Sequence, residues 1–166
     1  ATMQLTGDPR RLANEPGMPG VVHVMDPWPY TWSWGESEEE ITHRNLTMTL
    51  ANHMSAMYVT DHMTVLAAAP ITHTAGLVSL PFMARGGRVI LMDGIDPQNL
   101  LKVIEQERVN MMFLPPTVIY TLLAQPNVRD FDFSALRYFM YGAAPMSPDK
   151  LAEAIEVFGP VMLQIY

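Results

Sequence analysis

The stretch "LRYFMYGAAPMSPDKLAEAIEVFGPVMLQIY", Leu136 to Tyr166, decides the predicted fold. Its apolar and aromatic residues up to Gly142 predict a buried strand. Ser147 is a typical residue before a helix, and the apolar positions that follow recur every three or four residues until Gly159, a usual helix terminator. The apolar residues from Val161 onward predict a second strand. A strand, a helix and a strand in this order predict two parallel strands joined by a right-handed crossover.

The same alternation extends back along the chain to Thr42, which is a plausible N-cap for a further helix. The predicted strands are residues 63–71, 88–92, 109–115, 136–142 and 161–166. The predicted helices are residues 42–57, 74–87, 96–108, 116–123 and 147–158, and "QPNVRDFDF", residues 125–133, is predicted to be a polar loop. The fold class predicted from this pattern is α/β, with a mainly parallel sheet flanked by helices on both sides.

Residues 1–41 differ from residues 42–166 in composition, and we treat the two ranges as separate regions. "ATMQLTG", Ala1 to Gly7, has the composition of a buried strand that enters a loop, and the prolines and glycines after it predict an extended loop. The acidic "GESEEE" near the end of this region is expected to be solvated. All three tryptophans of the chain lie in this region: Trp28, Trp32 and Trp34. They predict a strand or turn packed on the protein, or else a lid or a contact surface for a second copy or another protein.

The overall composition excludes several classes of function. With 166 residues the chain is long enough for one domain or part of one. A formal net charge of −7 without a basic run argues against nucleic acid as a partner. The absence of cysteine excludes disulfides, a thiolate nucleophile and a cysteine metal site. No apolar run reaches the roughly 18 residues of a membrane span, and we expect a cytoplasmic protein. The sequence at both ends leads us to expect a longer parent protein.

The turn after residues 136–142 is the most informative candidate site. Ligands of parallel sheets bind at the carboxyl ends of the strands, and "YGAAPMSP" places Gly142, Ala143 and Ala144 at such an end. These residues leave the backbone bare, so that a flat ligand can lie against the peptide groups. The same small residues also suit a tightly packed turn, and the residue types alone leave both interpretations open.

With these segments in view, residues 42–166 resemble the adenylate-forming enzymes, which include acyl-CoA synthetases, aryl-CoA ligases, luciferases and the adenylation domains of peptide synthetases. The resemblance is carried by "THRNL", "APITHTAGLVSLPFMARGGRVILM", "FLPPTVIYTLL", "LRYFMYGAAPMSP" and "FGPVMLQIY", preceded by "ATMQLTG". The order and spacing are most similar to those of fatty-acyl and related carboxylate–CoA ligases. The resemblance therefore implies part of the N-terminal domain of an acyl-CoA synthetase.

The resemblance also implies a set of binding residues. The residues implied for the nucleotide, with Tyr166 stacking on adenine, are Gly142, Ala143, Ala144, Pro145, Gln164, Ile165, Tyr166, Thr6 and Gly7. The residues implied for the acyl pocket are His73, Gly76, Tyr141 and Gly142. No catalytic residue and no metal ligand of the family falls on a matching position.

The implied reaction joins a small carboxylic acid to ATP, giving an acyl-adenylate and pyrophosphate, after which the thiol of CoA displaces AMP. The family uses Mg²⁺ and a loop ending in Pro-Lys-Gly to neutralise the phosphates, but no such loop lies between Gly7 and Thr42. The magnesium-binding glutamate would follow Tyr166. We therefore expect an ATP-dependent ligase as the parent protein and no activity from these 166 residues alone. The alternative is a divergent relative that binds a ligand or partner without catalysis.

Overall fold

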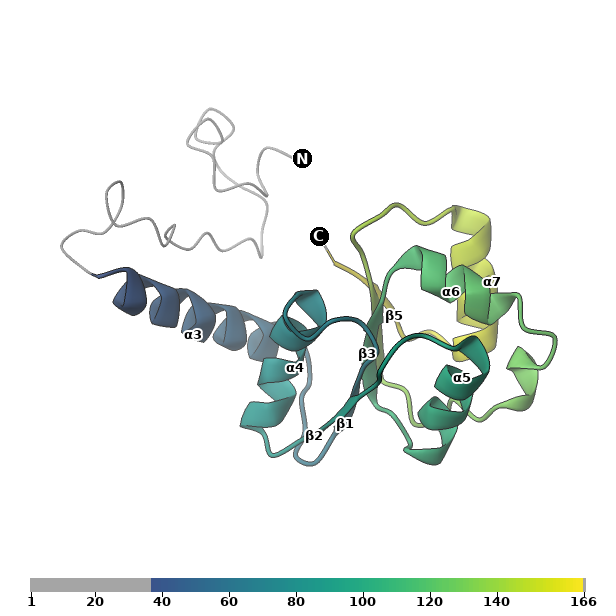
Figure 1. Ribbon diagram of the computed structural model, residues 1–166, viewed down its shortest axis with the longest axis horizontal. Helices are drawn as coiled ribbons and strands as arrows, with labels where there is room; N and C mark the ends of the chain where they lie inside the picture. The colour runs from purple at the N-terminus through teal and green to yellow at the C-terminus, as the bar shows by residue number, and fades with distance from the viewer. Residues whose placement is uncertain (1–36, 166) are drawn as a thin grey trace. The chain divides into compact units, whose positions relative to one another are not determined.

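The structure is a computed structural model, and it describes residues 37–165 (Figure 1). The chain divides into two compact units, Ala1–Tyr58 and Val59–Tyr166. Several sequence predictions concern residues outside the described range, namely Thr6, Gly7, Trp28, Trp32, Trp34 and Tyr166. Those predictions, and the boundary placed at residues 41 and 42, stay predictions.

Helix α3, Glu38–Ala56, is the described element of the first unit. It begins with a capping box, in which the Ser37 N–H donates to Glu40 Oε2 at 2.8 Å and the Glu40 N–H donates to Ser37 Oγ at 3.3 Å. Hydrogen bonds from the Ser37 backbone and hydroxyl lower the pKa of the Glu40 carboxyl below its usual value. The sequence prediction that the helix starts at Thr42 is therefore wrong, because the reciprocal cap at Ser37 satisfies amide groups that Thr42 would leave unpaired.

The second unit is built on a five-stranded sheet in the order β2-β1-β3-β4-β5. The strands are β1 Thr64–Ala67, β2 Arg88–Leu91, β3 Met111–Leu114, β4 Tyr138–Tyr141 and β5 Met162–Gln164. Every neighbouring pair is parallel. All five predicted strands are present, each shorter than its apolar run.

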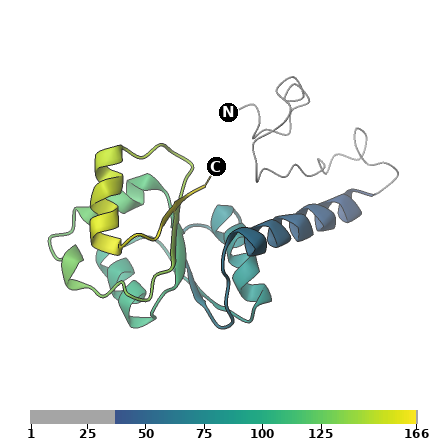
Figure 2. The same ribbon diagram turned by 180° about the vertical axis from the view of Figure 1, so that it is seen from behind.

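Four helices cover the two faces of this sheet: α4 Thr74–Ala84, α5 Pro97–Gln106, α6 Pro116–Leu123 and α7 Pro148–Phe158. Helix α4 lies on one face, and α5, α6 and α7 lie on the other (Figures 1 and 2). A short 3-10 helix, Val128–Asp130, lies in the segment predicted as a polar loop, and it buries Val128. The predicted α/β class with a parallel sheet is confirmed.

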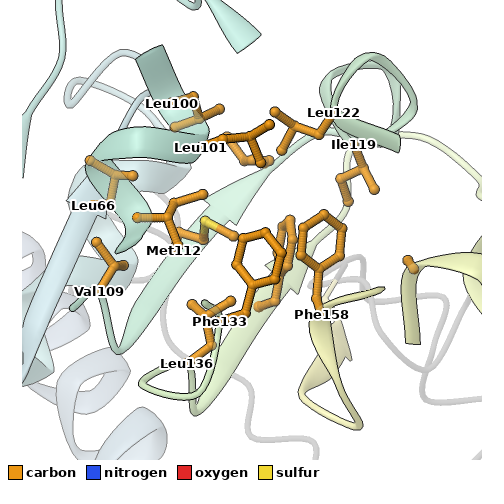
Figure 3. Close-up of a cluster of buried hydrophobic side chains, with 14 of the residues drawn as sticks. Leu66, Leu100, Leu101, Val109, Met112, Ile119, Leu122, Phe133, Leu136 and Phe158 are labelled. Atoms are coloured by element: carbon orange, nitrogen blue, oxygen red, sulfur yellow. The ribbon is translucent and has the colours of Figure 1, made fainter. Parts of the chain in front are cut away.

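The main hydrophobic core fills the space between the sheet and helices α5, α6 and α7 (Figure 3). At its centre the ring of Phe158 makes edge-to-face contacts with Phe133 and Phe139, with ring centroids 4.8 Å and 5.0 Å away. On the opposite face, α4 packs Phe82 edge-on against Tyr138 at 6.5 Å. The apolar strands are therefore covered on both sides, as parallel strands require.

Asn110, immediately before β3, ties three segments together at the amino end of the sheet. Its Oδ1 accepts a hydrogen bond from the Thr64 N–H at 2.7 Å, and its Nδ2 donates to the Ala135 carbonyl at 3.0 Å. Its backbone N–H donates to the Thr64 carbonyl at 2.8 Å. One side chain thus fixes β1 against β3 and against the segment that leads into β4.

We expect Asn110→Ala to lower the free energy of unfolding by about 2–3 kcal/mol, because it leaves a buried Thr64 N–H and the Ala135 carbonyl without these partners. Urea denaturation followed by circular dichroism measures the change. Asn99→Ala, at an exposed position of α5, is the matched control and should change stability by about 0.5 kcal/mol or less. Equal stability of the two variants would contradict the role given to Asn110.

Candidate functional site

The carboxyl ends of the five parallel strands lie along one edge of the sheet. The loops that follow β1, β2 and β4 begin at this edge, Ile165 follows β5 there, and α6 begins there shortly after β3. Ligands of open parallel sheets bind at such an edge. Two pockets that described residues line are found along it, one beside β4 and β5 and one beside β1 and β2.

The pocket beside β4 and β5, here named the Gly142 pocket, has a volume of about 420 Å³. It is lined by Gly142, Ala143, Ala144, Pro145, Gln164 and Ile165. These are all the predicted nucleotide-binding residues that the structure describes. They come from two segments far apart in the sequence, which meet because β4 and β5 are neighbours in the sheet. Their role in binding stays a prediction, but the structure places them around one cavity.

Gly142 and the three residues after it contribute to this pocket in different ways. Gly142 is buried, and a Cβ atom there would overlap the backbone carbonyl oxygen of Ile165 and lie 3.2 Å from its Cγ1. Only glycine permits this close approach of the two strand ends. Ala143, Ala144 and Pro145 are exposed and form the open wall. The sequence left two interpretations open, and each applies to different residues. Tight packing accounts for Gly142, whereas the residues after it leave the backbone bare.

Ala143 holds an unusual backbone conformation, with φ at +65°. For a residue with a Cβ atom, this left-handed conformation is less favourable by roughly 1–2 kcal/mol. The turn carries the chain from β4 toward Ser147, whose Oγ accepts a hydrogen bond from the Lys150 N–H at 3.4 Å and caps α7. Such strained residues cluster at functional sites, where the surrounding structure holds them.

Tyr141, predicted for the acyl pocket, has its side chain in the hydrophobic core rather than in the cavity. It is 3% exposed and belongs to the cluster beneath α5, α6 and α7. Its hydroxyl donates to Gln164 Oε1 at 3.4 Å, so it reaches the Gly142 pocket through a residue that lines it. The backbone carbonyl of Tyr141 accepts a hydrogen bond from the Ile165 N–H at 2.9 Å, which holds the end of β5 beside β4.

His73 is the N-cap of α4 and Gly76 lies in the first turn of this helix; neither is among the residues that line the Gly142 pocket. His73 is exposed and precedes the helix, and its carbonyl accepts a hydrogen bond from the Gly76 N–H at 3.0 Å. A Cβ on Gly76 would overlap the carbonyl oxygen of Ile71, so this glycine allows the loop to pack on the first turn of α4. The structure does not bring these two residues into one cavity with Gly142, and their acyl role stays a prediction.

The second pocket was not predicted from the sequence. It has a volume of about 530 Å³ and is lined by Ala67, Ala68, Ala69, Pro70, Ile71, Leu91, Met92, Asp93, Gly94 and Ile95. Ile71, Leu91 and Ile95 are exposed by 40% or more. The sequence feature that could have indicated this pocket is the run of alanines from Ala67 to Ala69, because small side chains leave room between neighbouring loops.

Charged groups are absent from the described lining of the Gly142 pocket. Within residues 37–165, no three His, Asp or Glu side chains lie close enough together to hold a metal ion. None of the described residues that line the Gly142 pocket carries a carboxylate that could hold the magnesium ion that the resemblance implies. In the same part of the chain, no helix has both the length and the apolar character needed to cross a membrane.

Comparison with known proteins places these features in a family. The medium/long-chain-fatty-acid–CoA ligase FadD8 of Mycobacterium tuberculosis is 36% identical over 101 residues, covering 61% of this chain and 18% of the ligase. Feruloyl-CoA synthase of an Amycolatopsis species is 39% identical over 118 residues, covering 70% of this chain and 24% of the synthase. The chain thus spans about a quarter or less of the length of these relatives.

Solved structures give the same result for the fold. The amide bond synthetase McbA of Marinactinospora thermotolerans superposes with a TM-score of 0.67 at 31% identity, over 73% of this chain and 25% of McbA. The model of the family described as AMP-binding enzyme matches residues 40–166. The match includes the described residues of the Gly142 pocket and both strands that form it. The chain therefore belongs to the AMP-binding enzyme family, whose members include CoA ligases.

Proposed function

We propose that the protein carrying this chain is an ATP-dependent ligase that converts a carboxylic acid into an acyl-adenylate and then into a CoA thioester, with the reaction in the cytoplasm. In this proposal the chain supplies the adenine-binding wall of the active site. The observation that carries it is the Gly142 pocket, in which the six described residues implied by the family resemblance line one cavity at the carboxyl edge of the sheet. Membership of the AMP-binding enzyme family also supports this proposal.

The chemistry of the Gly142 pocket suits an adenine ring. Its walls carry small or apolar side chains at Ala143, Ala144, Pro145 and Ile165, so a flat ring can approach the backbone. The volume of about 420 Å³ falls within the range of small-molecule sites. Gln164 lines the pocket, and its side-chain amide, whose Oε1 accepts a hydrogen bond from Tyr141, carries the donor and acceptor groups that the polar edge of a base can pair with. Tyr166, the next residue but one, is proposed to stack on the ring.

The described residues bind and orient, but they do not neutralise the phosphates. Attack of a carboxylate on the α-phosphate concentrates negative charge, which needs cationic or hydrogen-bond donors placed in advance. No charged side chain is among the described lining residues of the Gly142 pocket. The groups that carry this charge are therefore proposed to come from other parts of the parent protein, in line with the inactivity predicted for the chain alone.

We propose an apolar carboxylic acid as the substrate, with a fatty acid as the first candidate. The names of the relatives support this class, since one acts on medium- and long-chain fatty acids and another is a feruloyl-CoA synthase. His73, Gly76 and Tyr141 are proposed to border the acyl group beside Gly142. The amide bond synthetase among the structural relatives indicates that the acceptor of the acyl group needs its own test.

Acid-dependent exchange of labelled pyrophosphate into ATP tests the proposed function. We expect the parent protein to catalyse exchange with octanoate or dodecanoate, with ferulate as the aromatic comparison, and we expect none from the 166-residue chain alone. Calorimetric titration with AMP is run in parallel. Binding of AMP without exchange for any acid would establish the non-catalytic alternative. Absence of AMP binding by a folded parent protein would overturn the proposed function altogether.

A further inference from the structure

In the loop that lines the Gly142 pocket, residues 142–147, the half-buried Met146 packs against the hydrophobic core, and the three residues before it lack such cover. Ala143, Ala144 and Pro145 are exposed, and Ala143 carries the strained φ of +65°. A loop in this conformation keeps its shape only where its two ends are held. At the β4 end, the close contact between Gly142 and the Ile165 carbonyl provides that restraint.

The other end of the loop is held by a side chain from a different helix. The Ser147 N–H donates a hydrogen bond to the phenolic oxygen of Tyr120 at 3.2 Å. Tyr120 is half-buried and lies in α6, which packs against both α5 and α7. Helix α6 starts with Pro116 directly after β3, so its first turns are fixed to the sheet. The phenolic oxygen is thus a fixed acceptor at the point where the loop enters α7.

We propose that Tyr120 is a positioning residue for the nucleotide site. By accepting the Ser147 N–H, it holds the loop in the shape that exposes the backbone of Ala143 and Ala144 to the ligand. Tyr120 is not among the residues that line the Gly142 pocket, so it acts through the loop rather than by touching the base. This inference rests on the proposed function for its ligand, while the restraint on the loop is independent of any ligand.

Without the phenolic oxygen, the Ser147 N–H forms a hydrogen bond with water instead, and the loop samples other conformations. Binding of the nucleotide must then also order the loop, and the conformational entropy lost in this ordering lowers the affinity. One hydrogen bond of this kind corresponds to a change of about threefold to tenfold. The effect is specific to the loop, because Tyr120→Phe keeps the ring and its packing in α6.

The test compares Tyr120→Phe with Thr121→Val in the parent protein that carries this chain. Thr121 is the next residue of the same helix, and its hydroxyl donates to the Val118 carbonyl at 2.7 Å, so its replacement removes a hydroxyl away from the loop. In calorimetric titrations with AMP, we expect Tyr120→Phe to bind about threefold to tenfold more weakly than wild type, and Thr121→Val to bind equally well. The thermal midpoints of both variants should lie within a few degrees of the wild-type value and of each other, because each variant loses one hydrogen bond.

Amide hydrogen exchange without nucleotide gives a second readout. We expect faster exchange at residues 143–147 in Tyr120→Phe, with unchanged exchange in β3 and β4. Wild-type AMP affinity together with wild-type exchange in Tyr120→Phe would overturn the inference, as would equal weakening by Thr121→Val. If the wild-type parent protein binds no AMP at all, the proposed function of the pocket fails, and the exchange rates alone decide whether Tyr120 restrains the loop.

Discussion

Replacing Gly142 by alanine is expected to weaken AMP binding by about 100-fold and to lower the free energy of unfolding by about 2–3 kcal/mol. The added Cβ would overlap the backbone carbonyl oxygen of Ile165, which cannot rotate away as the tip of a side chain can. The ends of β4 and β5 must therefore separate. Because Gly142, Gln164 and Ile165 all line the same pocket, this separation changes both of its walls.

Gly94→Ala is the matched control for this substitution. Gly94 also lies at the carboxyl edge, but a Cβ there has no neighbour within 4 Å, and its φ of +82° makes alanine strained. We expect Gly94→Ala to cost about 1 kcal/mol of stability and to leave AMP affinity unchanged. AMP titration and urea denaturation of both variants separate the two effects. Wild-type AMP affinity in a folded Gly142→Ala protein would show that the close approach of the strands does not shape the site.

Replacing Phe158 by alanine is expected to lower the free energy of unfolding by about 3–5 kcal/mol. Phe158 is 3% exposed and lies where α7 meets the sheet. Its ring contacts Phe133 and Phe139 edge-to-face, as Figure 3 shows for the labelled pair Phe133 and Phe158. Its loss removes both aromatic contacts and leaves a cavity that the surrounding strands cannot fill by small movements.

Ile155→Ala provides the comparison on the same helix, because Ile155 is 41% exposed. We expect this variant to lose about 1 kcal/mol or less. Urea denaturation with fluorescence and circular dichroism as parallel probes measures both variants and checks that unfolding is two-state. A loss below about 1.5 kcal/mol for Phe158→Ala would mean that the core repacks around the missing ring, which contradicts the central role of Phe158.

Most of the secondary structure of the second unit could be predicted because its signals are local. Asp96 caps α5 and accepts a hydrogen bond from the Asn99 N–H at 2.7 Å, as the Asp-Pro pair predicts. Ser147 and Gly159 bound α7 at the predicted positions. The strands follow from apolar runs that only a sheet covered on both faces can bury. These features depend on neighbours within a few residues.

The prediction failed where two local signals compete or where a contact is non-local. Thr42 and Ser37 are both suitable N-caps, but only Ser37 has a glutamate three residues later that completes the capping box, and α3 starts there. The polar segment after α6 contains a 3-10 helix because Val128 and Phe133 are drawn into the core. Asn110 appears unremarkable in the sequence, and its importance depends on hydrogen bonds to residues far along the chain.

The sequence by itself determined the α/β class, the succession of elements and the identity of the small residues after β4. Tertiary structure alone decided that Gly142 is glycine because the Ile165 carbonyl lies against it, and that Tyr120 holds the far end of the loop. The physical reason is the range of the interactions. Caps and apolar periodicity act within a few residues, whereas the pocket depends on which strands become neighbours and on how closely their backbones approach.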